Sequence, residues 1–188
     1  MLSNLLGNIV FKSVFVVILL FPTMCTKEKS LYGNYEKLSE NFYLYWNVRN
    51  DTVDFKIVAK TNGWVALGFQ PIDELKEADI VLGYVKNEVV YLSDGFNLGR
   101  DWNHIPDVVL GGKNDIIDFR GKEQNNLTII EFSRKADTSD QFDKKINLNG
   151  FNRIVWLIGK GDFISNEYAE LGTAEIIFGK SDKWKGNY

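Results

Sequence analysis

The segment TVDFKIVAK, residues 52–60, alternates between apolar and polar side chains at nearly every position. In an extended chain the apolar positions fall on one face and the polar positions on the other, which is typical of a strand with one wet face. A strand of this kind needs a second layer to cover its apolar face, so it constrains the fold strongly. Further short strands are predicted over residues 42–48, 64–69, 79–85, 88–94, 153–159 and 173–178, and residues 115–135 are predicted to form a hairpin of two strands.

Turn-forming residues separate these segments, and no segment has the pattern of a long helix. Asn50-Asp51 and Lys86-Asn87 predict tight hairpins, and residues 123–126 predict another. Residues 95–114 have no clean period and are predicted to form a long loop, with room for one short strand. Thirteen Phe, eight Tyr and five Trp also favour sheet. We therefore predict an all-β fold, an immunoglobulin-like β-sandwich of about nine strands.

The first 25 residues differ in composition from the rest of the chain. The apolar run at residues 13–21 is shorter than the roughly 20 residues that span a bilayer, and it fits a secretory signal. Cys25, where this run meets a polar stretch, suggests lipid attachment; plain secretion and an uncleaved anchor are the alternatives. We expect residues 1–25 to be this signal or anchor, 26–39 a polar tether, 40–178 the folded domain and 179–188 a tail. The domain is expected outside the cytoplasm, held at the membrane through its N-terminus.

Composition and charge exclude several functions. The formal net charge is −3 and no basic face stands out, which argues against nucleic acid as a partner. One histidine, His104, and one cysteine cannot form a zinc or copper site, and no serine has a nucleophile context. Carboxylates crowd the loops and suit calcium, but such groups are usually solvated or cap turns; they are Asp101, Asp107, Asp115, Asp118, Asp137, Asp140 and Asp143. We therefore predict no metal site and no enzyme activity.

The order of motifs in the chain resembles the DOMON domain family. GWVALGF is followed by a loop, then by ADIVLGYV, YLSD, PDVVLGG and RIVWLIGKGD, and the resemblance covers residues 40–178. The family takes its name from dopamine β-monooxygenase and includes the cytochrome domain of cellobiose dehydrogenase. The resemblance implies an immunoglobulin-like β-sandwich that binds a ligand without catalysing a reaction.

The same resemblance implies where a haem would be held. Cytochrome members of the family ligate haem b through a methionine before the Ala-Asp pair and a histidine before a glycine in the last loop. The corresponding positions here carry Leu75 and Ala169 or a neighbour, and neither leucine nor alanine has a donor atom. A haem b electron-transfer module is therefore the alternative rather than the main hypothesis.

The main hypothesis is a binding domain for a small ligand such as carbohydrate, with an envelope protein as the alternative partner. A protein-docking or structural role in the cell envelope is thus a third possibility. We expect Trp64 and Trp156 in the core, Trp102 in contact with ligand, and Asp79 and Asp94 bonded to loop amides. The residues predicted for the pocket are Trp64, Phe69, Leu75, Asp79, Tyr84, Trp102, His104 and Trp156.

Overall fold

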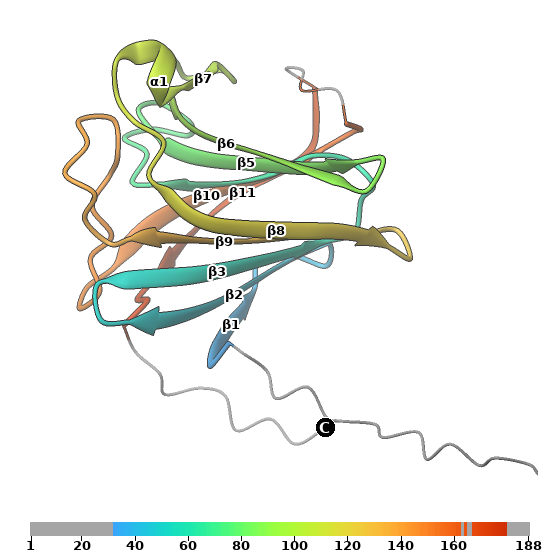
Figure 1. The fold of residues 1–188 in the computed structure, drawn as a ribbon, viewed down its shortest axis with the longest axis horizontal. Helices are drawn as coiled ribbons and strands as arrows, with labels where there is room; N and C mark the ends of the chain where they lie inside the picture. The colour runs from blue at the N-terminus through green and yellow to red at the C-terminus, as the bar shows by residue number, and fades with distance from the viewer. Residues whose placement is uncertain (1–31, 163, 165–166, 180–188) are drawn as a thin grey trace, which may run out of the picture.

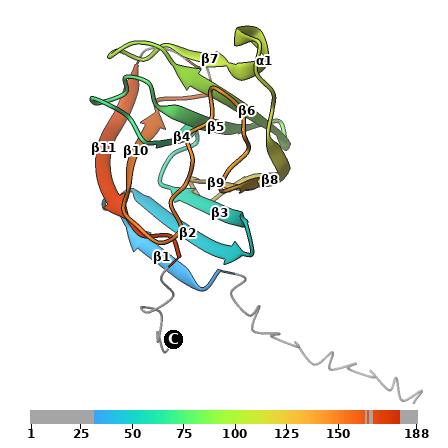
Figure 2. The same ribbon diagram turned by 90° about the vertical axis from the view of Figure 1, so that its left-hand side faces the viewer.

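Two antiparallel sheets stack face to face in this protein (Figures 1 and 2). The computed structural model describes residues 32–162, 164 and 167–179. The prediction of an all-β sandwich is confirmed, with eleven strands in this part of the chain rather than about nine. The strands are β1 (Asn34–Lys37), β2 (Phe42–Arg49), β3 (Thr52–Ala59), β4 (Val65–Phe69), β5 (Asp79–Lys86), β6 (Val89–Asn97), β7 (His104–Pro106), β8 (Ile116–Gln124), β9 (Leu127–Lys135), β10 (Asn152–Gly159) and β11 (Tyr168–Ile176).

The order of strands is β1-β2-β3-β9-β8 in sheet A and β11-β10-β4-β5-β6-β7 in sheet B. The alternation in β3 works as the sequence predicts: Val53, Phe55 and Ile57 are buried against sheet B. Residues of β4 and β10, among them Phe69 and Trp156, meet them from the other sheet. The interior of the sandwich is therefore filled by side chains from both sheets, as close packing requires.

Asparagines make the tight turns between strands. Asn87 and Glu88, which join β5 to β6, have φ values of 51° and 64°, and Asn125 and Asn126, between β8 and β9, have 54° and 59°. Two successive residues with positive φ match the twist of the strands that they connect, and asparagine tolerates this conformation better than most residues. The hairpins predicted at these places are present.

Two segments differ from their expected structure. Strand β1 pairs with β2, so the sandwich begins within the expected tether at 26–39. The expected loop at 95–114 holds the end of β6, the strand β7 and a four-residue helix, α1 (Asp107–Leu110). The sequence allowed one short strand in this loop, as β7 is, but it showed no pattern for β1 or α1 because each has only four residues. Cys25 and the predicted signal lie outside the described residues, and within those residues no helix has the length and apolarity of a membrane span.

Candidate functional site

Buried charges gather at one end of the space between the sheets. Asp79 lies opposite Phe69 in the ladder of β4 and β5, and Asp94 lies opposite Val81 in the ladder of β5 and β6. Phe69 and Val81 belong to the interior core, so both carboxylates project inward as well. Arg134 reaches the same place from β9 in the facing sheet.

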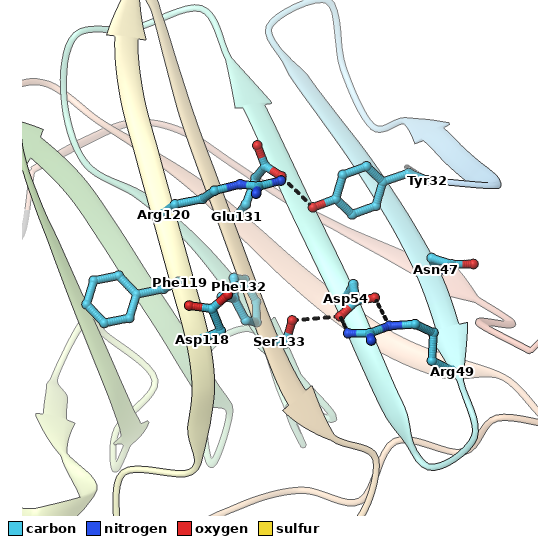
Figure 3. Close-up of a pocket in the computed structure, with 10 residues that line it drawn as sticks. All are labelled: Tyr32, Asn47, Arg49, Asp54, Asp118, Phe119, Arg120, Glu131, Phe132 and Ser133. Carbon is cyan, nitrogen blue, oxygen red and sulfur yellow. Dashed lines mark hydrogen bonds and ion pairs between the residues drawn. The ribbon is translucent and has the colours of Figure 1, made fainter. Parts of the chain in front are cut away.

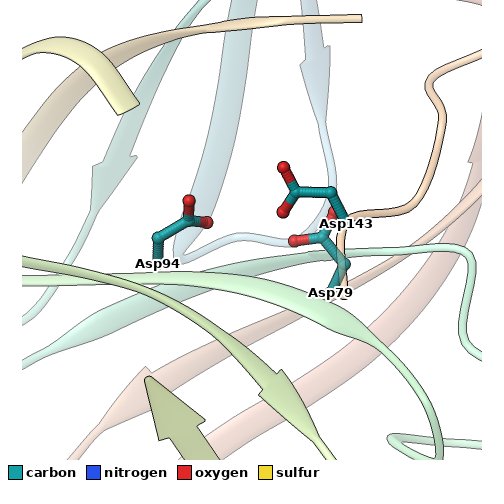
Figure 4. Close-up of side chains that lie close together, drawn as sticks. All are labelled: Asp79, Asp94 and Asp143. Atoms are coloured by element: carbon teal, nitrogen blue, oxygen red, sulfur yellow. The ribbon is translucent and has the colours of Figure 1, made fainter. Parts of the chain in front are cut away.

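The guanidinium of Arg134 binds two carboxylates from different segments. Its Nη1 donates to Asp79 Oδ2 at 2.7 Å, and its Nη2 lies 3.3 Å from Oδ2 of Asp143, which stands in the connection between β9 and β10. The backbone N–H of Lys144 also donates to Asp79 Oδ2, at 2.8 Å. Figure 4 shows the carboxylates of Asp79, Asp94 and Asp143 pointing toward one another. We call these three residues with Arg134 the acidic centre.

Negative charge in this region exceeds positive charge. Asp107, at the start of α1, is fully buried and neither of its carboxylate oxygens has a hydrogen-bond partner. Oδ1 of Asp79, Oδ1 of Asp94 and both oxygens of Asp143 are likewise buried without such a partner. The second oxygen of Asp94 accepts only from the backbone N–H of Asp115, at 2.8 Å. Buried polar atoms are normally satisfied, so this number of orphaned oxygens in one place needs an explanation.

Burial changes the protonation of these groups. It raises the pKa of Asp94 to about 7 and that of Asp79 to about 6. Burial, together with the charge of Asp94, raises the pKa of Asp107 to about 8. Burial alone would lower the pKa of Arg134, but the charges of Asp79 and Asp143 outweigh it and raise that pKa, so Arg134 stays charged. The carboxylates therefore need either protons or a further cation.

The spacing of the carboxylates suits a divalent cation. One oxygen from each of Asp79, Asp94 and Asp143 can be chosen so that all three lie within 4.8 Å of one another. Oxygens on opposite sides of a calcium ion lie about 4.6–5.2 Å apart, twice the usual calcium–oxygen distance. Calcium also tolerates irregular geometry better than magnesium does. The centre can thus hold calcium, although no metal site was predicted from the sequence.

The eight residues predicted for a ligand pocket lie in three different places. Phe69 and Trp156 fill the interior between the sheets, and Asp79 belongs to the acidic centre. Tyr84 and the remaining residues lie on the outer face of sheet B, where Tyr84 stacks on Tyr91 with ring centroids 4.8 Å apart. The structure therefore does not bring the predicted set together into one pocket.

Aromatic rings cover much of the outer face of sheet B. Trp102 stacks on Trp64 with centroids 4.9 Å apart and on His104 at 5.7 Å. The expected contact of Trp102 with ligand is not supported, because its side chain is buried in this stack. Gly159 makes room for Trp64, since an added Cβ would lie 2.3 Å from the indole nitrogen. Burial lowers the pKa of His104 to about 4, so this imidazole is neutral at pH 7.

The positions implied for haem ligands do not fit a haem. Leu75 is buried in the same cluster as Trp64 and Trp102, and its side chain offers no donor atom. The side-chain amide of Asn97 holds this arrangement, donating to the carbonyl oxygen of Leu75 at 3.0 Å and to that of Asp101 at 3.1 Å. Ala169 lies exposed on β11 and has no donor either. Packed side chains thus occupy the position from which the first ligand of a haem iron would come.

The fold and the acidic centre define a β-sandwich domain with a buried acidic site. A family model for the DOMON domain matches residues 38–159. The chain therefore belongs to the DOMON domain family, as its motif order suggested. It matches larger proteins over one part of their length.

Two relatives are monooxygenase-like by name. The chain is 33% identical over 120 residues to MOXD1 homolog 2 of Drosophila melanogaster, a match that covers 64% of this chain and 15% of that protein. It is 30% identical over 115 residues to DBH-like monooxygenase protein 1 of Mus musculus, covering 61% and 18%. This chain thus corresponds to less than a fifth of the length of either relative.

A solved structure shares the fold. The cytochrome b domain of pyranose dehydrogenase from Coprinopsis cinerea superposes with a TM-score of 0.52 at 7% sequence identity. The superposition covers 76% of this chain and 79% of that one. At this level of identity the likeness supports the β-sandwich and says nothing about the ligand.

Proposed function

We propose that this DOMON domain is a non-catalytic binding module whose fold holds a divalent cation, calcium by preference, in the acidic centre. The observation that carries the proposal is the set of buried oxygens without hydrogen-bond partners on Asp79, Asp94 and Asp143, of which only Oδ2 of Asp143 has an ion pair, with Arg134; Asp107 lies beside them. A single guanidinium cannot balance this many carboxylates. A calcium ion supplies two positive charges and takes six to eight oxygen ligands.

A non-catalytic role fits the chemistry of the described residues. Histidine is the most frequent general base, and His104 is buried against Trp102 and bonded through Nε2 to the hydroxyl of Ser93 at 3.0 Å. The names of the relatives describe proteins several times longer than this chain. We propose that any oxygenase chemistry belongs to other parts of those proteins, and that this domain binds a small ligand such as carbohydrate.

The proposed location rests on the sequence. We propose that the domain lies outside the cytoplasm and is held at the membrane through its N-terminal segment, with Cys25 as the site of lipid attachment. Labelling with a palmitate analogue tests this: the intact protein should take up label and Cys25→Ser should not. Equal labelling of both would remove the lipoprotein proposal and leave a secretory signal or an anchor.

Haem b is the weaker alternative because Leu75 and Ala169 cannot ligate iron. Adding haem to the purified protein should give no low-spin Soret spectrum, and such a spectrum would reinstate the electron-transfer module. Docking to an envelope protein is the remaining alternative. It would be favoured if the protein bound neither calcium nor a sugar but copurified with a defined envelope protein.

Thermal unfolding with and without calcium tests the cation. At a calcium concentration of about 100 times the Kd, a ligand that binds only the folded state stabilises it by about 2.7 kcal/mol. For a domain of this size, that corresponds to a rise in Tm of roughly 5–10 °C. Asp94→Asn should keep its stability in EDTA, because asparagine resembles the protonated carboxyl, yet lose most of the rise. Asp118→Asn, on the exposed strand β8, should keep the full calcium-dependent rise in Tm.

A further inference from the structure

A polar groove lies on the outer face of sheet A, away from the acidic centre. It has a volume of about 250 Å³ and is lined by side chains of β2, β3, β8 and β9 together with Tyr32 (Figure 3). Drug-sized ligands occupy pockets of roughly 300–1,000 Å³, so this groove suits a ligand of one ring rather than a long chain. Strands β2, β3 and β9 are paired in register beneath it, which gives a regular floor, and β8 joins β9 with a register shift between Ile116 and Asp118.

One side of the groove is a guanidinium held flat by a carboxylate. Nε and Nη2 of Arg49 donate to the two oxygens of Asp54 at 2.6 and 2.7 Å. The hydroxyl of Ser133, opposite Asp54 in the β3–β9 ladder, donates to the same carboxylate at 2.6 Å. Two-point bonding of this kind fixes the plane of the guanidinium as well as its position.

The other side repeats the arrangement. Nη2 of Arg120 donates to Oε2 of Glu131 at 2.7 Å, and the hydroxyl of Tyr32 donates to the same oxygen at 2.7 Å. Arg120 and Glu131 are directly opposite each other in the β8–β9 ladder. Both pairs are therefore set before any ligand arrives, which lowers the entropy cost of binding.

The pairs leave more hydrogen-bond donors than they use. A guanidinium carries five N–H groups. The contacts to Asp54 and Glu131 occupy two of them on Arg49 and one on Arg120. The remaining donors can bind acceptor oxygens of a ligand, while carboxylate lone pairs beside them can accept from ligand hydroxyls.

The charge of the groove determines whether it favours a charged or a neutral ligand. Two arginines face three carboxylates, those of Asp54, Glu131 and Asp118, so the lining carries no net positive charge. An anionic ligand such as a phosphate or a uronic acid gains little from such a surface, because each guanidinium is already neutralised. A ring with several neutral hydroxyl groups matches it, because each hydroxyl both donates and accepts.

We infer that this groove binds a single uncharged saccharide unit through Arg49, Arg120 and the carboxylates paired with them. The inference rests on the proposed role of the domain as a non-catalytic binding module, and it adds the place and the charge class of the ligand. Asp118 is then a specificity-determining residue, because its unpaired charge adds to the repulsion of acidic sugars.

Titration of the full chain with neutral monosaccharides and with their uronic acids tests the inference, with binding followed by NMR of the protein. Glucose, galactose, mannose and xylose form the neutral panel, and glucuronate and galacturonate the acidic one. At least one neutral sugar should bind and shift the amide signals of Asp54 and Ser133, while the uronic acids bind at least tenfold more weakly. Asp118→Asn should narrow that difference.

Variants at exposed positions locate the site without threatening the fold. Arg49→Ala and Arg120→Ala should each weaken binding about tenfold or more, and Lys122→Ala, on the same exposed strand as Arg120 but outside the groove, should not. Neutral-sugar binding that survives both arginine changes would place the site elsewhere and overturn the inference while leaving the binding module intact. Tighter binding of the uronic acids, or no binding of any neutral sugar, would overturn it too; the calcium experiment is independent of all these outcomes.

Discussion

Replacing Arg134 by methionine removes the single cation from the acidic centre. The Arg134 side chain is 1% exposed, donates to Asp79 at 2.7 Å and lies over the ring of Phe69 with 5.3 Å from Cζ to the ring centroid. Methionine keeps an unbranched chain against Phe69 but leaves Asp79 and Asp143 without a positive partner. Arg134→Met therefore isolates the charge from the packing.

The expected loss follows from the burial of the pair. Removing one partner of a buried ion pair costs roughly 3–5 kcal/mol, and two unit charges 4 Å apart interact by about 4 kcal/mol at an effective dielectric constant of 20. For a domain of this size each kcal/mol lowers Tm by about 2–4 °C, so Arg134→Met should lower it by roughly 6–20 °C. Calcium should restore much of the loss, because it replaces the missing charge.

Thermal unfolding followed by circular dichroism, in EDTA at about pH 8 where the carboxylates are most ionised, measures this effect. Arg49→Met is the matched control: it removes a guanidinium from Asp54, but the Arg49 side chain is 63% exposed, and an ion pair open to solvent on one side is worth about 0–1 kcal/mol. If Arg134→Met melts at the temperature of the parent protein under these conditions, or if Arg49→Met costs as much, the charge of Arg134 does not stabilise the acidic centre.

Three further outcomes follow from the same contacts. Burial raises the folded-state pKa of Asp94 to about 7 and that of Asp79 to about 6, so their protons stabilise the calcium-free fold below about pH 4, and this stabilisation is lost as the pH rises through 6 and 7. In EDTA, the Tm of Asp94→Asn should therefore fall less over this pH range than the Tm of the parent protein. An equal fall in both proteins would contradict the raised pKa of Asp94. Trp102→Ala should destabilise the fold by about 3–5 kcal/mol in denaturant unfolding, since a buried ring is removed; a change below about 1 kcal/mol would mean that the ring is not packed as described. Leu75→Met, titrated with haem, should give no six-coordinate spectrum because Ala169 supplies no opposite ligand, and the appearance of one would show that another side chain does.

The sandwich itself could be predicted because its strands carry their pattern locally. Alternation in β3 and in β9 marks which residues face the core, and the asparagine turns mark where hairpins close. Strand β1 escaped prediction because four residues are too few to show a period, and for the same reason the short strand allowed in the loop at 95–114 could not be placed at β7. Trp102 was assigned to a loop surface for a similar reason: the residues around it do not indicate that it stacks on Trp64, which lies 38 positions earlier in the sequence.

The acidic centre was missed although part of its signal is present in the sequence. The alternation that places Ile130 and Phe132 in the core also places Arg134 there, and a charged residue at an inward position requires a partner. The partners come from three other segments: Asp79 and Asp94 stand on β5 and β6, and Asp143 stands in a connection without regular structure. Only the folded chain brings them together, so no spacing rule for metal ligands applies.

Calorimetric titration of the EDTA-treated, dialysed protein with calcium chloride tests the proposed cation site most directly. We predict one ion per domain with a Kd of roughly 10⁻⁴–10⁻³ M or tighter, the range of calcium-binding extracellular modules. Binding should be weaker for magnesium and lost in Asp94→Asn. The absence of any binding heat and any calcium-dependent rise in Tm, or unchanged binding in Asp94→Asn, would contradict the account.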